Sequence, residues 1–522
     1  MNSRDTYRPR VGFWVVLILG VFAWAPAAYP GYWQGLEGFT PVFNALQPGT
    51  ISTLAADADL WRGTGSAAYI LAQPFLMLGL PATATIRFLF AFLLVIGGLS
   101  VYAWMAPRWG DRAAGLAGFL YMLLPPVLAT VYVRGSLADA WILALLPLAL
   151  AAIAYYGLTV SPGAAAALVV SILWMWRTQA GLALLATVLL VLYALLVERN
   201  RIAGLVVAVS GVAGFVSLIP LWSIQRPAPV DFFAHFVYAF QLGDNGWTVA
   251  PSIPGWQDEF PFQLGFAALA LGVLALWLWL SRAENRSTTT YRAFLGFAAI
   301  GTITLVLLSL NPAGFFWRIT GLHRMLTYPW QTLLLAMPLL AALAGSVPAL
   351  LPQLSRVPYW PALVGLTLLA SYPYLRTDFT QYAPPDRPYA TLGGHNEIVL
   401  LEAFLEESTD PPGAQLDVVW QTRYPLATDY SIFFQAQVED GDGYRSIAQL
   451  DMPPHGEALP PTSWRPGEIL EYRYELDLAQ AAAAGDLSGQ ELRYIFGYYD
   501  WRDGVRLPVD GGIDDKLIFY GR

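Results

Sequence analysis

Long apolar runs alternate with short polar interruptions over the first 373 residues of the chain. The first run, VGFWVVLILGVFAWAPAAY, follows Arg4, Arg8 and Arg10 and has the length that crossing a bilayer requires. Ten further runs have the same character, at roughly 82–106, 113–130, 138–158, 164–176, 180–197, 203–223, 262–280, 293–310, 328–350 and 358–373. The pattern therefore predicts an α-helical polytopic membrane protein with about eleven transmembrane helices.

Two apolar segments near the N-terminus leave alternatives open. The first run contains APAA, which resembles a small-residue cleavage site, so a signal peptide is the alternative to a first span. With either interpretation, the loop after it lies outside the cytoplasm. The stretch 66–80 is short and is broken by Pro74, which favours an interfacial or re-entrant helix.

From about residue 374 the pattern changes to short alternating segments separated by Gly, Pro, Asp and Glu. The segments are LDVVWQT, DYSIFFQAQV, YRSIAQLDM, EILEYRYELDL, ELRYIFGYYD and KLIFYGR. Six or seven short strands at this spacing are typical of an antiparallel β-sandwich. We therefore predict a helical transmembrane domain over residues 1–373 and an all-β sandwich domain over residues 374–522.

Composition agrees with this division. The chain is 56% hydrophobic and 13% charged, whereas about a quarter of the residues of a soluble domain are charged. From Arg376 onward there are 25 acidic and 11 basic residues, as expected of a solvated domain. Cysteine is absent, which excludes disulfides, cysteine zinc sites and thiol nucleophiles.

The distribution of arginine predicts the orientation in the membrane. If the N-terminus is cytoplasmic, the inside loops are richer in arginine than the outside loops, as the positive-inside rule requires. The inside arginines are then Arg4, Arg8, Arg10, Arg108, Arg112, Arg199, Arg201, Arg282, Arg286, Arg292 and Arg356. An odd number of spans places the C-terminal domain outside. We therefore expect a multi-pass protein of the plasma membrane with an extracytoplasmic sandwich.

The first outer loop, residues 29–65, is too long and too aromatic for a simple connector. Its acid Glu37 lies between Gly35 and Gly38, a flexible setting from which a carboxylate can reach a substrate. Such a carboxylate can act as a general base or help to hold a divalent cation. The alternative is an ordered cap without chemistry.

Later in the same loop, Asp57 and Asp59 stand beside Arg62. We include all three among the candidate substrate-binding residues. The two acids could equally cap an interfacial helix or pair with the arginine, and this structural interpretation is the stronger one for them.

A second group of candidates lies at the outer start of the helix 138–158. Ser136 and Asp139 form an S-x-x-D capping pattern, and an acid in the first helical turn is favoured by the helix dipole. Arg134 has no acid before it in the local sequence. An arginine at a membrane boundary either extends to the interface or binds a phosphate.

A third group combines two arginines and a histidine with aromatic residues, in Phe316-Trp-Arg318, Leu322-His323-Arg324 and Tyr328-Pro-Trp330. These cationic groups would suit the phosphate of a lipid head group. Aromatic residues at an interface are also ordinary membrane anchors, and we weigh the two interpretations evenly.

Several kinds of chemistry have no support in the sequence. The chain contains no GxxxxGK[ST] loop, no HExxH motif and no dinucleotide fingerprint, and its four histidines are scattered over separate segments. A histidine metal site is therefore not expected, and we expect no nucleic-acid partner.

Three motifs carry a resemblance to a known family. They are Gly35-Leu-Glu37-Gly38, then Tyr132-Val-Arg134-Gly135 with Asp139 five residues beyond the arginine, and Tyr328-Pro-Trp330. Over residues 11–350 the chain resembles bacterial membrane proteins labelled 6-pyruvoyl-tetrahydropterin synthase-related, which in turn resemble GT-C glycosyltransferases. The tail is similar to a β-sandwich module appended to many such proteins, through Gln449-Leu-Asp451, Pro454 and Trp464-Arg-Pro-Gly467.

The resemblance implies transfer of a sugar from a polyprenyl-phosphate carrier on the outer membrane face. It implies a catalytic role for Glu37 and for Asp139, with a divalent cation as a possible cofactor. The chain departs from the family pattern at Glu37, which is usually Asp, and at Ser136, where an acid is common. It also has Arg177-Thr-Gln179 where a histidine is often found, and we include Arg177 among the substrate-binding candidates.

The sequence therefore predicts an integral membrane glycosyltransferase-like protein whose partners are membrane lipid and a polyprenyl-phosphate carrier. The alternative is a non-catalytic membrane protein whose β-sandwich binds a cell-surface glycan or a partner protein. A transporter is less favoured because polar groups within the spans are too sparse to form a substrate path.

Overall fold

The computed structural model describes residues 10–46, 66–219, 230–244, 246–281, 289–441, 443–485, 487, 491–510, 512 and 514–521. The chain forms two compact units, which are considered separately below. The helical unit contains Met1–Tyr32 and Gln47–Phe379, and the β unit contains Trp33–Leu46 and Thr380–Arg522. The predicted boundary between residues 373 and 374 lies close to the third passage of the chain between the units, after Phe379.

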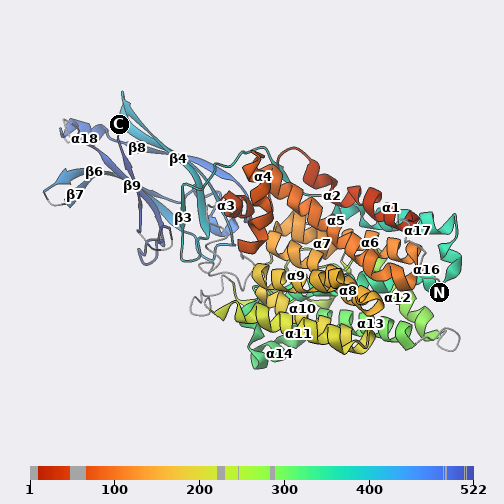
Figure 1. The fold of residues 1–522 in the computed structure, drawn as a ribbon. Coiled ribbons are helices and arrows are strands. Elements are labelled where there is room, and N and C mark those ends of the chain that lie inside the picture. The colour runs from red at the N-terminus through yellow and green to blue at the C-terminus, as the bar shows by residue number, and fades with distance from the viewer. Residues whose placement is uncertain are drawn as a thin grey trace. The chain divides into compact units, whose positions relative to one another are not determined.

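The helical unit is built from α-helices joined by short 3₁₀ and π-helical turns (Figure 1). The α-helices are α1 (Val11–Trp14), α2 (Val21–Ala28), α4 (Gln73–Met77), α5 (Ala82–Trp109), α6 (Asp111–Met122), α7 (Pro125–Ala129), α8 (Leu137–Thr159), α9 (Pro162–Thr178), α10 (Ala180–Leu192), α11 (Arg201–Val216), α12 (Phe266–Ser281), α13 (Thr289–Ser309), α14 (Gly314–Thr320), α15 (Thr332–Gly345), α16 (Val347–Leu350) and α17 (Tyr359–Ser371). The turns used below are η4 (Ser66–Ala72), η5 (Thr130–Arg134), η8 (Phe232–Ala234), η11 (Leu322–Met325) and η12 (Pro329–Gln331).

Within the described residues, six helical stretches are long and apolar enough to cross a membrane. They are Val11–Ala28, Ala82–Trp109, Leu137–Thr159, Ala180–Val197, Tyr291–Ser309 and Pro329–Leu350. A seventh follows if Asp111–Met122 and Pro125–Arg134, which bend by 43° at their junction, form one span. The predicted membrane-type helical fold is thus confirmed, and the predicted count of eleven spans is not.

The difference in count comes from helix length. Helices also lie at the other predicted positions, but α9, α11, α12 and α17 have only 17, 16, 16 and 13 residues. About 20 residues are needed to cross the hydrocarbon core without tilt. The short helix predicted at 66–80 is present as η4 and α4.

Apolar side chains cover both the inside and the outside of the helical unit. Helix α8 packs against α5 and α9 (Figure 1). Most of α8 and all of α15 are buried. On outer helices, Leu205, Val273 and Ile300 are 63%, 65% and 68% exposed. Apolar surface of this extent is unfavourable in water and suits a lipid environment.

The β unit consists mainly of two four-stranded antiparallel sheets. One sheet has the order β3 (Ala390–Leu392), β4 (Ile398–Thr409), β5 (Pro412–Thr422), β8 (Leu470–Asp477), and the other β10 (Leu517–Tyr520), β9 (Arg493–Tyr499), β6 (Ser431–Asp440), β7 (Gly443–Met452). Two short helices, α3 (Thr40–Leu46) and α18 (Ala479–Ala483), belong to the same unit. Strands β1 (Tyr32–Trp33) and β2 (Phe379–Thr380) form a separate two-stranded sheet.

Alternation of side chains explains the core of the β unit. In β5, Leu416, Val418 and Trp420 are buried, while Asp417 and Val419 between them are half-buried. The buried residues join a single hydrophobic cluster that also contains residues of the other sheet, such as Phe434 and Tyr494. A C-terminal β-sheet region is therefore confirmed, and the finer description as a sandwich stays a prediction.

The predicted outer loop is divided between the two units. Its segment Trp33–Leu46 belongs to the β unit, where a Cβ on Gly38 would lie 2.4 Å from the side chain of Gln421. A Cβ on Gly467 would lie 1.8 Å from the carbonyl oxygen of Gly35. Gly467 approaches backbone, which leaves no room for a side chain, and Gly38 has φ +52°, a left-handed conformation that favours glycine.

Candidate functional site

The candidate site in the helical unit begins at the junction between η5 and α8. Gly135 has φ +72°, a left-handed conformation that glycine adopts without strain. This residue ends η5 and redirects the chain into α8. Ser136 is the N-cap of α8 and accepts a hydrogen bond from the Asp139 backbone N–H at 3.5 Å. The predicted cap and the predicted place of Asp139 in the first turn are confirmed.

Arg134 and Asp139 form a buried ion pair across this junction. Arg134 is 8% exposed and Asp139 is 0% exposed, so solvent screens the interaction between their charges only weakly. The Gln331 side chain completes the arrangement, because its Nε2 donates to Asp139 Oδ2 at 3.1 Å. Gln331 Oε1 accepts from the backbone N–H groups of Thr327 and Tyr328, both at 3.1 Å, which fixes the orientation of the amide.

Aromatic rings cover the guanidinium of Arg134. Its central carbon lies 5.8 Å from the ring centre of Tyr328 and 5.5 Å from that of Trp330, within the range of cation–π attraction. The two rings stack on each other at 4.8 Å, and Phe260 stacks on Trp330 at 4.5 Å. The buried Trp330 Nε1 has no hydrogen-bond acceptor among the described residues. A buried donor of this kind costs free energy unless a ligand or a water molecule accepts a hydrogen bond from it.

Next to Tyr328 lies a second buried polar chain, formed by His235, Ser252 and Asp258. The rings of His235 and Tyr328 are 5.2 Å apart, edge to face. The Ser252 hydroxyl donates to Asp258 Oδ2 at 2.6 Å and lies 2.9 Å from His235 Nδ1. Because the hydroxyl proton is directed to the carboxylate, His235 Nδ1 carries the proton in its own bond, and Nε2 is the unprotonated nitrogen.

Burial shifts the pKa values of both His235 and Asp258. Burial lowers the pKa of His235 to about 4 and raises the pKa of Asp258 to about 6. Hydrogen bonds from Ser252 and the Phe260 backbone oppose the shift at Asp258. At neutral pH the imidazole is therefore uncharged and the carboxylate is ionised.

The third group of sequence candidates is connected to this region through η8. Arg318 is exposed and lies over the ring of Phe233 at 4.8 Å. His323 packs on the same ring at 4.9 Å and bonds through Nδ1 to the Trp317 carbonyl at 2.9 Å. Arg324, next to His323 in η11, is exposed.

His235 directly follows η8 and packs on Tyr328 beside Arg134. Phe233 contacts Arg318 and His323, and His235, two residues later, contacts Tyr328 beside Arg134. A series of contacts through Phe233, His235 and Tyr328 thus links Arg318 and His323 to Arg134. The sequence alone did not indicate this link.

Other predicted residues lie elsewhere. Glu37 is half-buried in the turn before α3 of the β unit, where its carbonyl accepts from the Thr40 N–H at 3.0 Å. Since Glu37 and Asp139 belong to different units, a common cavity for the two stays a prediction. Arg177, at the end of α9, donates to the Ser217 carbonyl at 3.2 Å.

The remaining candidates, Asp57, Asp59 and Arg62, lie outside the described residues. Within the described part of the chain, no three His, Asp or Glu side chains are grouped so that they could hold a metal ion. Asp57 and Asp59 lie outside the described residues, so a divalent cation stays a prediction.

Four of the polar residues described above were missed by sequence reasoning. His235, Ser252 and Asp258 lie on a loop without regular periodicity, and their spacing gives no local signal. Gln331 directly follows the Tyr-Pro-Trp motif, and a polar residue at the start of an apolar helix was a signal that could have been used.

Two of the three family motifs, that of Arg134 and Asp139 and that of Tyr328 and Trp330, meet in this cluster. Their contact is a property of this chain and does not identify a family. Comparisons with family models, with curated proteins and with solved structures find no match, so the family resemblance stays a prediction that rests on the motifs.

Proposed function

We propose that the chain is an integral membrane protein of the glycosyltransferase type, which moves a sugar from a polyprenyl-phosphate donor to an acceptor outside the cytoplasm. The proposal includes eleven spans, a cytoplasmic N-terminus and an extracytoplasmic β-sandwich. The arrangement around Arg134 is the observation that supports it best.

The cluster has the properties expected at a lipid-phosphate site. Arg134 is a permanent cation held at an aromatic surface, and the nearby Trp330 indole has a buried N–H without an acceptor among the described residues. A phosphodiester oxygen is a suitable acceptor for both groups. Asp139 neutralises Arg134, so the additional positive charge for a phosphate comes from the exposed Arg318 and Arg324.

In the proposed reaction the acceptor hydroxyl attacks the anomeric carbon of the donor sugar. The bond between that carbon and the phosphate oxygen breaks, and the polyprenyl phosphate leaves with the bonding electron pair. The resemblance implies that Glu37 takes the hydroxyl proton as a general base, and cationic side chains stabilise the charge on the phosphate. Because Asp139 is fully buried, we assign it the role of positioning Arg134.

Replacing Glu37 with glutamine is expected to reduce donor turnover by about 100-fold or more, since a general base contributes roughly 10²–10⁴ to a rate. The measurement is release of polyprenyl phosphate from a polyprenyl-phosphate hexose in proteoliposomes, with crude envelope extract as the acceptor source. Glu406→Gln removes an exposed carboxylate from β4 and is the matched control. Equal turnover in Glu37→Gln and the parent would exclude Glu37 as the base.

The proposed orientation predicts the outcome of limited proteolysis. Protease added to spheroplasts should remove the region after residue 380 and leave the helical unit, because the acidic β unit faces outward. Inverted membrane vesicles are the control, in which the same region should be protected. Cleavage only in inverted vesicles would reverse the topology and remove the outer-face site.

A further inference from the structure

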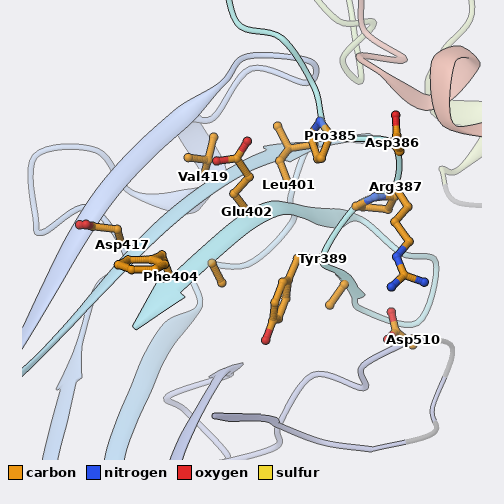
Figure 2. Close-up of a pocket in the computed structure, with 13 residues that line it drawn as sticks. Pro385, Asp386, Arg387, Tyr389, Leu401, Glu402, Phe404, Asp417, Val419 and Asp510 are labelled. Carbon is orange, nitrogen blue, oxygen red and sulfur yellow. The ribbon is translucent and has the colours of Figure 1, made fainter. Parts of the chain in front are cut away.

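The β unit carries a groove that the proposed transfer reaction does not use. Its volume is about 840 Å³, within the range of small-ligand pockets, and the loop before β3, strands β4 and β5, and a later loop line it (Figure 2). The residues that decide its chemistry are Arg387, Tyr389, Glu402, Phe404, Asp417 and Asp510. All of them belong to the β unit.

Two aromatic rings are exposed in this groove. Phe404 is 62% exposed and lies opposite Asp417 in the β4–β5 register (Figure 2). Tyr389 is 46% exposed, and one face of its ring stacks on Phe519 at 5.6 Å with an angle of 12° between the planes. The stacked neighbour fixes the Tyr389 ring and leaves its other face to a ligand. Single exposed rings are common, but two rings in one groove form a binding surface.

Carboxylates beside the rings are held in fixed orientations. The Tyr382 hydroxyl donates to Glu402 Oε1 at 2.7 Å, which leaves Oε2 as an acceptor directed by that bond. Arg473 binds both oxygens of Asp417, with Nε–Oδ1 at 2.6 Å and Nη2–Oδ2 at 2.8 Å. Fixed acceptors of this kind suit ligands that present several hydroxyl donors.

The electrostatic balance favours an uncharged ligand. Four carboxylates and one arginine line the groove, which disfavours a polyanion. Arg473 compensates Asp417, and Asp510 Oδ1 accepts from the backbone N–H and hydroxyl of Thr391 at 2.8 and 3.2 Å. In Figure 2 the Arg387 side chain points toward Asp510. Arg387 and Arg473 thus compensate part of the negative charge of the four carboxylates.

We propose that this groove binds a neutral oligosaccharide, with Phe404 and Tyr389 stacking on the C–H faces of successive sugar rings. The C–H bonds of a sugar face carry partial positive charge and match the negative face of an aromatic ring. Glu402 and Asp417 accept hydrogen bonds from hydroxyls at the ring edges, and Arg387 donates to ring or hydroxyl oxygens. The binding goes beyond the transfer reaction and does not depend on it.

The test uses the full chain in mild detergent, immobilised against defined probes. These are tetrasaccharides of α-1,4-glucose, β-1,4-glucose and β-1,4-N-acetylglucosamine, a polyuronate, and an octalysine peptide. At least one tetrasaccharide should bind, and Phe404→Ala should raise its dissociation constant about tenfold, in the range of an aromatic contact. Tyr389→Ala should have a similar effect, and Glu402→Gln a smaller one.

Trp501→Ala and Glu439→Gln are the matched controls, because they remove an exposed ring and an exposed carboxylate of the same unit that do not line the groove. Both should bind the tetrasaccharide like the parent. Phe404 is mostly exposed, so its variant should keep the parent melting temperature. Absence of tetrasaccharide binding, equal binding by Phe404→Ala, or groove-dependent binding of octalysine or polyuronate alone would overturn the proposal.

Discussion

Replacing Asp139 with asparagine is expected to lower the stability of the helical unit by about 3–5 kcal/mol, the usual effect of removing one partner of a buried ion pair. The residue is 0% exposed and its carboxylate contacts the Arg134 guanidinium. An asparagine keeps the size and a hydrogen-bonding oxygen for Gln331, but it cannot neutralise Arg134. The cost arises because the buried Arg134 guanidinium loses the charge of its carboxylate partner Asp139 in a site with little solvent.

The reciprocal and double variants separate this effect from a general loss of packing. Arg134→Met should destabilise to a similar extent, because Asp139 is then the uncompensated charge. The double variant Arg134→Met/Asp139→Asn should recover much of the loss, since neither charge remains. SDS titration in mixed micelles, followed by tryptophan fluorescence, measures the three variants. Additive losses in the double variant would contradict a dominant ion pair.

Exposed pairs provide the control. Arg473 and Asp417 form a bidentate pair on the surface of the β unit, with side chains 55% and 40% exposed. Solvent screens such a pair, so Arg473→Gln should leave stability nearly unchanged. A large effect there would mean that the denaturation reports something other than burial of charge.

The structure explains why sequence reasoning succeeded for some parts of this site and not for others. Ser136 and Asp139 were placed correctly because capping is a local property, set by residues three apart. The partner of Arg134 was only five residues away but on the far side of Gly135, whose left-handed conformation brings the two side chains together. The spacing of apolar residues along a helix gives no information on such a change of chain direction between two helices.

Longer-range contacts carried no signal in a single sequence. Gln331 reaches Asp139 from 192 positions away, and α12, α13 and α14 lie between His235 and Tyr328 in the chain. Helix positions were predicted well because apolar runs are a local signal, whereas the number of spans depends on lengths near the threshold, as in α9 and α12. The assignment of Trp33–Leu46 to the β unit depends on close packing at Gly38 and Gly467, which is also non-local.

The second large effect concerns pH and the chain from His235 to Asp258. In the folded protein, protons bind to Asp258 near pH 6 and to His235 near pH 4. In the unfolded chain the order is reversed, because histidine titrates near 6.5 and aspartate near 3.8. Both states thus take up one proton near pH 6 and a second near pH 4. The pair itself should contribute almost no pH dependence to the stability of the parent protein.

Single replacements should reveal two opposite slopes. In His235→Gln, the folded state binds a proton on Asp258 between pH 6 and 3.8 while the unfolded state does not, so stability relative to the parent should rise as the pH falls through this window. In Asp258→Asn, the unfolded state binds a proton on His235 between pH 6.5 and 4, whereas the folded state does not. Stability relative to the parent should therefore fall as the pH falls through this window. Each change should be about 2–3 kcal/mol, from shifts of roughly two pKa units.

Melting curves of the two variants and the parent in mild detergent, taken between pH 4 and 7, measure these slopes. Subtracting the parent curve removes the contributions of all other titrating groups. The double variant His235→Gln/Asp258→Asn lacks both groups and should show the same pH dependence of stability as the parent, because neither the folded nor the unfolded state then binds a proton at these two positions. Slopes of the same sign in the two single variants would contradict this account. They would show that Asp258 does not bind its proton before His235 in the folded protein, where both groups are buried beside Ser252.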